Sequence, residues 1–244
     1  MERETYDRMA EIDGAHWWFV GRRRIIAGLI ERHAPKRRPL RILEVGCGTG
    51  SNIPLLKDYG TVDAIEPDDA ARALSTARTG IAVKGGYLPD GVALADGAYD
   101  LIVLLDVLEH IPGDRAALTA LVTKLAPGGK LLLTVPAAPW MWSAHDVAHH
   151  HQRRYTPKTL RETVEAAGFR LIRQSHFNTL LFPLIAAVRL AGRLRGREGG
   201  DDAMPGRAVN GVLARLFGAE RYLMGAVPLP FGVSLAAVAE PSTR

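Results

Sequence analysis

Short apolar runs alternate with helix-like segments from residue 41 onward, and this alternation constrains the fold more than any other feature of the sequence. The runs are apolar on both faces, as strands buried within a parallel sheet are. They lie at residues 41–45, 62–66, 81–84, 99–105, 130–135, 169–174 and 232–239. The helix-like segments between them include residues 68–78, 115–125 and 156–167. The pattern predicts an α/β fold with a doubly wound, mostly parallel, seven-stranded sheet.

Two further segments frame this pattern. Residues 1–38 are helix-like, with apolar residues paired three and four positions apart. Residues 178–231 insert far more chain before the last run than a hairpin needs, and a glycine- and charge-rich stretch at 196–206 separates two apolar helical faces there. At 244 residues the chain can hold one well-covered domain, which we place at residues 39–244 with the helical insertion inside it.

The composition limits the class of protein. Hydrophobic residues make up 47% and charged residues 23%, which excludes wholesale disorder. The single cysteine, Cys47, excludes an internal disulfide framework and a multi-cysteine zinc site, and it fits a reducing cytoplasm. No apolar signal core opens the chain and no apolar run nears about 20 residues, so we expect a cytoplasmic protein, at most peripheral to a membrane. The net charge of +5 is only a weak indication of acidic partners.

A glycine-rich turn follows the first expected strand. Residues 44–50 read Glu-Val-Gly-Cys-Gly-Thr-Gly, and a helix is expected from about residue 52. Glycines let the chain turn sharply and let a ligand approach the backbone amides. Glu66, twenty residues after Gly46, can accept both hydroxyls of a ribose. Ser51 stands where a dinucleotide fingerprint needs its third glycine, and no Gly-Lys-Ser/Thr follows, so neither that fingerprint nor a P-loop is present.

Together with Asp-Val-Leu-Glu-His-Ile at residues 106–111, the glycine turn and Glu66 resemble the class I S-adenosylmethionine-dependent methyltransferases. The resemblance covers about residues 1–177 and implies a Rossmann-like fold that uses S-adenosyl-L-methionine. It also implies that the last strand, expected at 232–239, runs antiparallel between the fifth and sixth. A His-Trp-Trp-Phe opening followed by arginines is similar to that of some such enzymes and implies a lid over the cofactor at residues 1–38.

The resemblance also implies roles for individual residues. The first loop would surround the methionine part, Glu66 would hold the ribose, and the segment after the third strand would lie near the adenine. Gly85-Gly86 replaces the Gly-Asp of many relatives, so a carboxylate for the adenine amine is missing. The expected cofactor-binding residues are Trp17, Arg22, Glu44, Gly46, Cys47, Gly48, Glu66, Pro67, Gly86, Tyr87, Asp106 and Val107. Cys47 is interpreted as a small filler in a tight turn, and Glu109 and His110 either serve the site or cap the next segment in contact with solvent.

The loop after the fifth expected strand is dense in imidazole, carboxylate, guanidinium and phenol groups. Such loops form the ligand crevice of a parallel sheet, so the acceptor is expected here. Methyl transfer needs alignment, and a base helps when the acceptor is a hydroxyl or amine. We expect His145 or His151 as the base and Asp146 as the group that orients it. The expected substrate contacts are Trp140, Trp142, Arg153, Arg154 and Tyr155.

Several alternatives stay open for this loop and for the whole chain. Arg153 and Tyr155 could instead tie the loop to the next helix. His145, Asp146, His149 and His151 offer metal-ligand types, but consecutive histidines cannot all face one ion, so we expect no metal. The leading hypothesis is methylation of a hydroxyl, amine or carbon on a small or lipid-like acceptor. The alternatives are a membrane-associated scaffold without turnover and a nucleic-acid methyltransferase, but we expect no nucleic-acid partner. Residues 179–231 could form a cap over a hydrophobic acceptor, a membrane contact or a homodimer surface.

Overall fold

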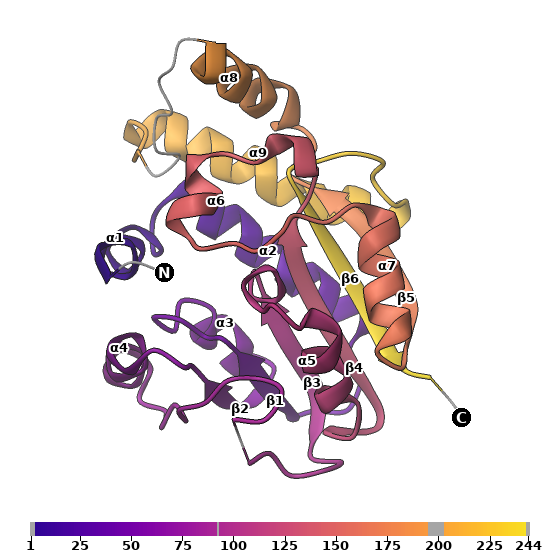
Figure 1. Cartoon of the computed structure of the whole chain (residues 1–244). Helices are drawn as coiled ribbons and strands as arrows, with labels where there is room; N and C mark the ends of the chain where they lie inside the picture. Colours follow the sequence, from indigo (N-terminus) through magenta and orange to yellow (C-terminus); the bar gives the residue numbers. More distant parts are fainter. Residues whose placement is uncertain (1–2, 92, 195–202, 243–244) are drawn as a thin grey trace.

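The computed structural model describes residues 3–91, 93–194 and 203–242. Its centre is a six-stranded sheet in the order β2-β1-β3-β4-β6-β5 (Figure 1). The strands are β1 (Leu40–Val45), β2 (Gly60–Ile65), β3 (Tyr99–Leu105), β4 (Leu125–Pro136), β5 (Phe169–Phe177) and β6 (Ser234–Pro241). Strands β1 to β4 pair in parallel, whereas β6 lies antiparallel between β4 and β5. The α/β fold and the antiparallel last strand expected from the sequence are therefore confirmed.

The expected strand at residues 81–84 forms only one isolated bridge, between Ile65 and Lys84. Two backbone hydrogen bonds, from Lys84 to Ala64 (2.9 Å) and from Glu66 to Lys84 (3.0 Å), hold the segment beside β2. Ala82 and Lys84 are exposed, so the run lies at an open edge with one side in solvent. With so little surface to bury, the segment does not extend into a seventh strand, and the sheet has six strands in the described part of the chain.

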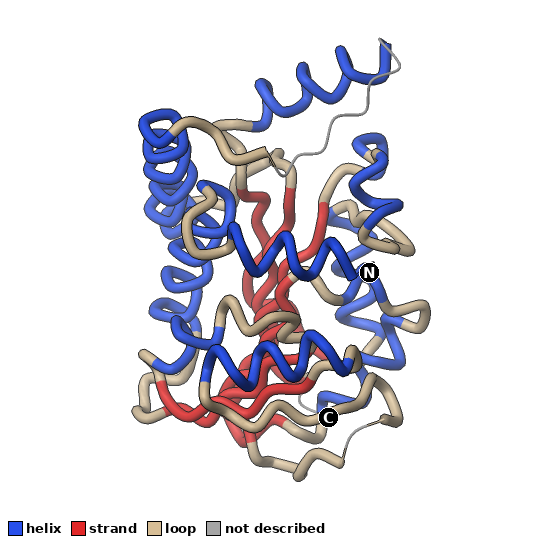
Figure 2. The backbone as a smooth tube through the Cα atoms, turned by 90° about the vertical axis from the view of Figure 1, so that its left-hand side faces the viewer, coloured by secondary structure: helices blue, strands red, loops and turns tan. Residues whose placement is uncertain are grey.

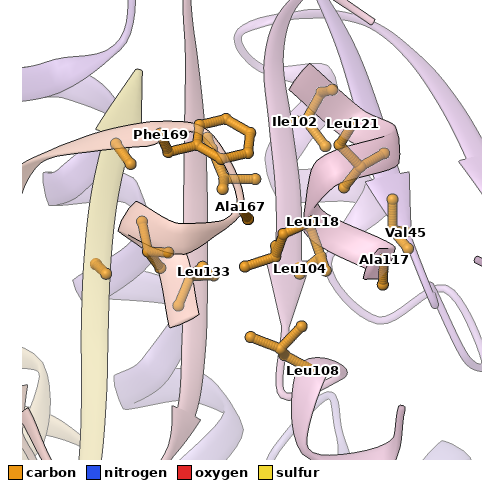
Figure 3. Packing of buried hydrophobic residues seen from close by; sticks show 14 of the residues in the cluster. Val45, Ile102, Leu104, Leu108, Ala117, Leu118, Leu121, Leu133, Ala167 and Phe169 are labelled. Atoms are coloured by element: carbon orange, nitrogen blue, oxygen red, sulfur yellow. The ribbon is translucent and has the colours of Figure 1, made fainter. Parts of the chain in front are cut away.

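Helices cover both faces of the sheet (Figure 2). One core lies under α5 and α7, where Leu118 and Leu121 of α5 pack toward Leu104 and Leu133 of the sheet (Figure 3). The other lies under α2 and α9. The longer helices are α1 (Arg3–Ile12), α2 (Trp17–His33), α4 (Asp69–Thr79), α5 (Asp114–Val122), α7 (Pro157–Ala166), α8 (Phe182–Leu194) and α9 (Arg207–Ala226). The short ones are α3 (Ile53–Lys57), η1 (Leu108–His110), η2 (Pro139–Met141) and α6 (Ala144–Ala148).

The helices α2 and α9 join the two segments that frame the domain in sequence. Phe217 of α9 stacks on Phe177 of β5, with ring centroids 6.1 Å apart, and contacts Trp17 edge-on at 5.8 Å. Gly21 of α2 faces the same Phe217 ring. Asn210 of α9 accepts a hydrogen bond from the Trp17 amide at 2.8 Å. The start of the chain and the insertion therefore pack as one layer on this face of the sheet.

Helix α8 stands away from the rest of the molecule at one end (Figures 1 and 2). It contacts the loop after β4, because Arg189 donates to the Met141 carbonyl at 3.3 Å and Phe182 contacts the Trp140 ring at 6.1 Å. Most of the stretch expected as a linker, residues 196–206, lies outside the described residues. No helix within the described ranges has the length and apolar character needed to cross a membrane.

The contact between Gly21 and Phe217 can be tested by a double-mutant cycle. A Cβ on Gly21 would lie 2.4 Å from Phe217 Cδ1, so Gly21→Ala should lower the free energy of unfolding by about 1–3 kcal/mol through overpacking. In a Phe217→Ala background the same change should cost almost nothing, because the ring is gone. Denaturant unfolding measures both values. Gly211→Ala in α9, which meets no atom within 4 Å, is the control and should stabilise the helix by up to about 1 kcal/mol. An equal cost for Gly21→Ala in both backgrounds would contradict the contact.

Candidate active site

The chain turns tightly at the carboxyl end of β1, over residues 46–50. Gly46, Gly48 and Gly50 have positive φ angles of 66°, 53° and 82°, which residues with a Cβ rarely adopt. A Cβ on Gly46 would also lie 2.7 Å from the Cγ2 methyl of Val107. Both the positive φ angles and the close approach of Val107 therefore require glycine in this turn. The turn brings the end of β1 against the segment that follows β3.

Glu66 closes this turn from the end of β2. Its carboxylate is buried and accepts hydrogen bonds from the amides of Gly48 at 2.8 Å and Asp68 at 3.1 Å. Burial raises the pKa of Glu66 above its ordinary value, although the two amides oppose the shift. The hydroxyl of Tyr6, from α1, also hydrogen-bonds to Glu66, and burial together with this carboxylate raises the pKa of Tyr6. Helix α1 thus reaches the carboxylate that was expected to hold a ribose.

Glu44 is the buried acid at the end of β1. Its Oε1 accepts a hydrogen bond from Asn52 at 3.0 Å, while Oε2 has no hydrogen-bond partner in the described part of the chain. Burial raises the pKa of Glu44 to about 7, against the opposing effects of Asn52 and Arg22. The free Oε2 oxygen leaves Glu44 able to accept a hydrogen bond from a cationic ligand group, whose charge would stabilise the ionised form that burial disfavours.

Arg22 of α2 joins the carboxyl ends of three strands. Its guanidinium is buried and pairs with Asp106, at the end of β3, with 2.5 Å between Nη2 and Oδ2. Longer contacts of 3.4 Å reach Asn52 after β1 and Thr134 in β4. The guanidinium also lies 5.1 Å from the centre of the Trp18 ring, in a cation–π arrangement. One cation from the N-terminal segment therefore pairs with the acid at the end of β3 and links it to the segments at two other strands.

The other residues expected around a cofactor lie in different surroundings. Cys47 is buried beside Ser75, and burial raises the pKa of its thiol to about 12. An unreactive thiol fits its interpretation as a filler of the turn. Trp17 packs on Phe217 of α9. Three further residues follow β2 or the run at 81–84 and are exposed or half-buried: Pro67, Gly86 and Tyr87.

Asp146 organises the loop after β4. It is fully buried and accepts hydrogen bonds from Nε and Nη2 of Arg154, at 2.8 and 2.9 Å. Nδ1 of His151 lies 2.8 Å from the same carboxylate. Asp146 also accepts from the Ser143 amide at 2.8 Å, which caps α6. Burial alone would raise the pKa of Asp146, but the hydrogen bonds from His151 and Arg154 outweigh it and hold the pKa well below its usual range. The loop is thus built around a permanently charged pair.

Four histidines gather beside this pair. The rings of His145 and His149 are 4.1 Å apart, and those of His110 and His151 are 4.7 Å apart. Burial, followed by neighbouring histidines, lowers the pKa of His149 to about 3 and that of His110 to about 4. Both rings are therefore neutral near pH 7 and keep lone pairs for hydrogen bonds or ligands.

Glu109 lies in the same cluster, and its burial decides against one of the two interpretations given for it. The side chain is fully buried, so the interpretation that it contacts solvent is wrong. The sequence pattern did not indicate that Tyr6, Asn52 and Thr134 contribute to the edge of the sheet. The sequence singled out the histidines and Asp146 of the loop after the fifth expected strand, but its pattern did not place Glu109 and His110 beside them.

Arg153 and Tyr155 connect the loop to the start of α5. Arg153 pairs with Asp114 at 2.8 Å and donates to the carbonyls of Ile111 and Pro112. The Tyr155 hydroxyl donates to the same Asp114 at 2.7 Å. Two tryptophans expected to contact the acceptor are exposed: Trp140 and Trp142.

The buried pair of Asp146 and Arg154 predicts a large effect of neutralising the acid. Asp146→Asn should lower the free energy of unfolding at pH 7 by about 3–5 kcal/mol, because Arg154 is left buried without its countercharge. The pKa of Asp146 is depressed in the fold, so this difference should shrink as the pH falls below about 4, where the carboxylate of the unfolded chain protonates. Urea unfolding at several pH values measures it. Asp96→Asn, in an exposed pair with Lys124, should change little, and equal effects of the two variants would contradict the assignment.

Comparison with known proteins identifies the family. A family model described as a methyltransferase domain matches residues 19–174. The chain is 28% identical over 163 residues to the ubiquinone biosynthesis O-methyltransferase of Idiomarina loihiensis, a match covering 58% of this chain and 66% of that protein. It is 29% identical over 158 residues to the trans-aconitate 2-methyltransferase of Streptomyces avermitilis, covering 54% and 58% respectively. Each match thus spans less than two thirds of the relative.

Solved structures share the fold. A chain of the complex between the Haloferax volcanii Trm112 methyltransferase activator and its methyltransferase partner superposes with a TM-score of 0.66 at 18% identity. The superposition covers 99% of this chain and 96% of that one. At this identity the likeness concerns the fold alone. Because the family model spans more than half of the sequence, the chain belongs to the class I S-adenosylmethionine-dependent methyltransferases.

Proposed function

We propose that this chain transfers a methyl group from S-adenosyl-L-methionine to a hydroxyl, amine or carbon of a small or lipid-like acceptor. The observation that carries the proposal is the meeting of the glycine turn with the buried carboxylate of Glu66, which accepts the Gly48 amide at 2.8 Å. Backbone amides beside a carboxylate suit a nucleoside, because the carboxylate accepts both ribose hydroxyls. The names of two relatives, which act in ubiquinone biosynthesis and on trans-aconitate, agree with small acceptors.

The residues around the turn fit the parts of this cofactor. The ribose would lie at Glu66, and the adenine beyond it near Gly86 and Tyr87. Glu44 Oε2, which lacks a hydrogen-bond partner among the described residues, would accept the ammonium of the methionine end. Arg22 would face its carboxylate. When bound, the cofactor supplies a methyl group on a sulfonium, and the residues of this chain orient that group and exclude water around it.

On the acceptor side, the hydrogen bond between Asp146 and His151 fixes the His151 ring. With Nδ1 directed at the carboxylate at 2.8 Å, Nε2 is left to accept a proton. His145, whose ring lies 6.3 Å from that of His151, is the second candidate base. Either imidazole would remove the proton of a hydroxyl or amine acceptor as its oxygen or nitrogen takes the methyl. Arg153, Arg154 and Tyr155 keep this loop in place through their contacts with Asp114 and Asp146.

The nature of the acceptor is suggested by the surface beside this loop. Leu184, Val188 and Leu190 of α8 are each more than half exposed, and Trp140, which contacts α8 through Phe182, is 58% exposed. An apolar surface next to the crevice would suit an acceptor with a hydrocarbon portion. The same surface favours a second function, peripheral contact with a membrane, in which α8 would serve as the docking element.

Replacing Glu66 tests the proposed cofactor site. Glu66→Ala should weaken S-adenosylhomocysteine binding at least about 10-fold, since hydrogen bonds to a charged group contribute about 1.5–3 kcal/mol. Isothermal titration calorimetry measures the dissociation constant. Asp69→Ala, an exposed acid three residues further on, is the matched control and should bind normally.

The same pair of variants tests turnover. Wild type and Asp69→Ala should transfer label from methyl-labelled S-adenosylmethionine into the organic phase of a cell extract, and Glu66→Ala should transfer much less when the cofactor is limiting. Failure of the wild type to bind millimolar cofactor would exclude the function. Label that appears only in water-soluble products would restrict the acceptor to small polar molecules.

A further inference from the structure

The carboxylate of Glu109 is buried without a partner. The side chain has no exposed surface, and neither oxygen accepts a hydrogen bond from another described residue. Leaving a buried carboxylate unpaired is costly, because its hydration is lost and nothing replaces it. Buried polar atoms without partners are rare enough in native proteins that each one needs an explanation.

The nearby cations are already engaged. Arg22 pairs with Asp106 and Arg154 with Asp146. Asp106 adds a further negative charge close to Glu109, and the charges of Arg22 and Arg154 also act on it. The side chains in the described part of the chain therefore leave Glu109 without a cation of its own.

Two histidines, His110 and His151, lie beside the Glu109 carboxylate. One ligand atom each from Glu109, His110 and His151 lie within 4.8 Å of one another. The His151 Nδ1 is bound to Asp146 at 2.8 Å, which leaves Nε2 for a ligand. The His110 ring hydrogen-bonds to the backbone of His149 through one nitrogen. A histidine whose second nitrogen is held by a carboxylate or a carbonyl is the usual arrangement of a metal ligand.

We infer that Glu109, His110 and His151 bind one divalent transition-metal ion of the Zn²⁺ type. Two imidazoles and one carboxylate suit such an ion, whereas Mg²⁺ and Ca²⁺ prefer oxygen ligands. This grouping differs from consecutive histidines, because its ligands come from η1 and from the loop after α6. Three protein ligands leave at least one coordination position open, as in catalytic rather than structural sites.

The position of the site suggests what the ion would do, and this step rests on the proposed function. Val107, two residues before Glu109, touches Gly46 of the proposed cofactor turn. A hydroxyl oxygen bound to the ion would have a lowered pKa. With Nε2 of His151 bound to the ion, His145 would be the base: as it took the proton, the oxygen would form a bond to the methyl carbon. The carbon–sulfur bond would break and its electron pair would stay on sulfur, giving S-adenosylhomocysteine. The acceptor would thus be an oxygen nucleophile.

Metal binding can be measured without cofactor or acceptor. Full-length protein treated with a chelator and then dialysed should bind one Zn²⁺ per chain in a calorimetric titration. Added Co²⁺ should give visible d–d absorption with nitrogen ligation. Glu109→Gln, which keeps the shape of the side chain, should weaken Zn²⁺ binding at least about 100-fold, since loss of a residue that only orients a metal ligand already costs about 10–100-fold. His150→Asn removes an exposed neighbouring histidine and should leave binding unchanged.

Thermal unfolding of the metal-free proteins gives a second readout. Glu109→Gln should melt no lower than wild type, because the substitution breaks no hydrogen bond of the carboxyl group. The inference is overturned if wild type binds no stoichiometric Zn²⁺, if Glu109→Gln binds as wild type does, or if His150→Asn loses binding equally. Cofactor binding without metal binding would leave the proposed function intact and reject the metal site. Metal binding without cofactor binding would leave the metal site intact and reject the proposed function.

Discussion

The ion pair between the buried guanidinium of Arg22 and Asp106 is the interaction on which the rest of the structure depends. Parallel strands bring their carboxyl ends to one edge of the sheet. Here Arg22 contacts Asp106 and Thr134 directly, and it reaches Glu44 by way of Asn52, which hydrogen-bonds to both. A cluster of buried acids would repel itself without a countercharge. Arg22 supplies that charge from α2, so the N-terminal segment is part of the site as well as a cover over the sheet.

A second buried acid is paired with an arginine in the same way. Asp146 and Arg154 form a buried bidentate pair in the loop after β4, and His151 is fixed by the same carboxylate. Glu109 lies near both pairs, and its carboxylate accepts no hydrogen bond from either arginine. The two paired acids are satisfied within the protein, whereas the remaining acid can gain a ligand. This contrast is why the cluster around Glu109 suits a cation.

The sequence predicted those features that depend on local pattern. The apolar runs placed the strands, the glycines of residues 46–50 placed the turn, and the fold type was confirmed. The run at 81–84 has the same local pattern but lies at an exposed edge, so it forms one bridge instead of a strand. The pairing of Arg22 with Asp106 joins residues 84 positions apart, and the burial of Glu109 depends on the loop after α6. Contacts of this range leave no periodic trace in a sequence.

The most direct test of the account is a crystal structure with S-adenosylhomocysteine. We expect both ribose hydroxyls within about 2.6–3.2 Å of the Glu66 carboxylate, with the amino-acid end of the ligand between Glu44 and Arg22. Tyr6, which contacts Glu66 in the free protein, should then yield its place at that carboxylate or share it with the ribose. Density for the nucleoside elsewhere on the molecule, with Glu66 still bound only to Gly48, Asp68 and Tyr6, would contradict the account.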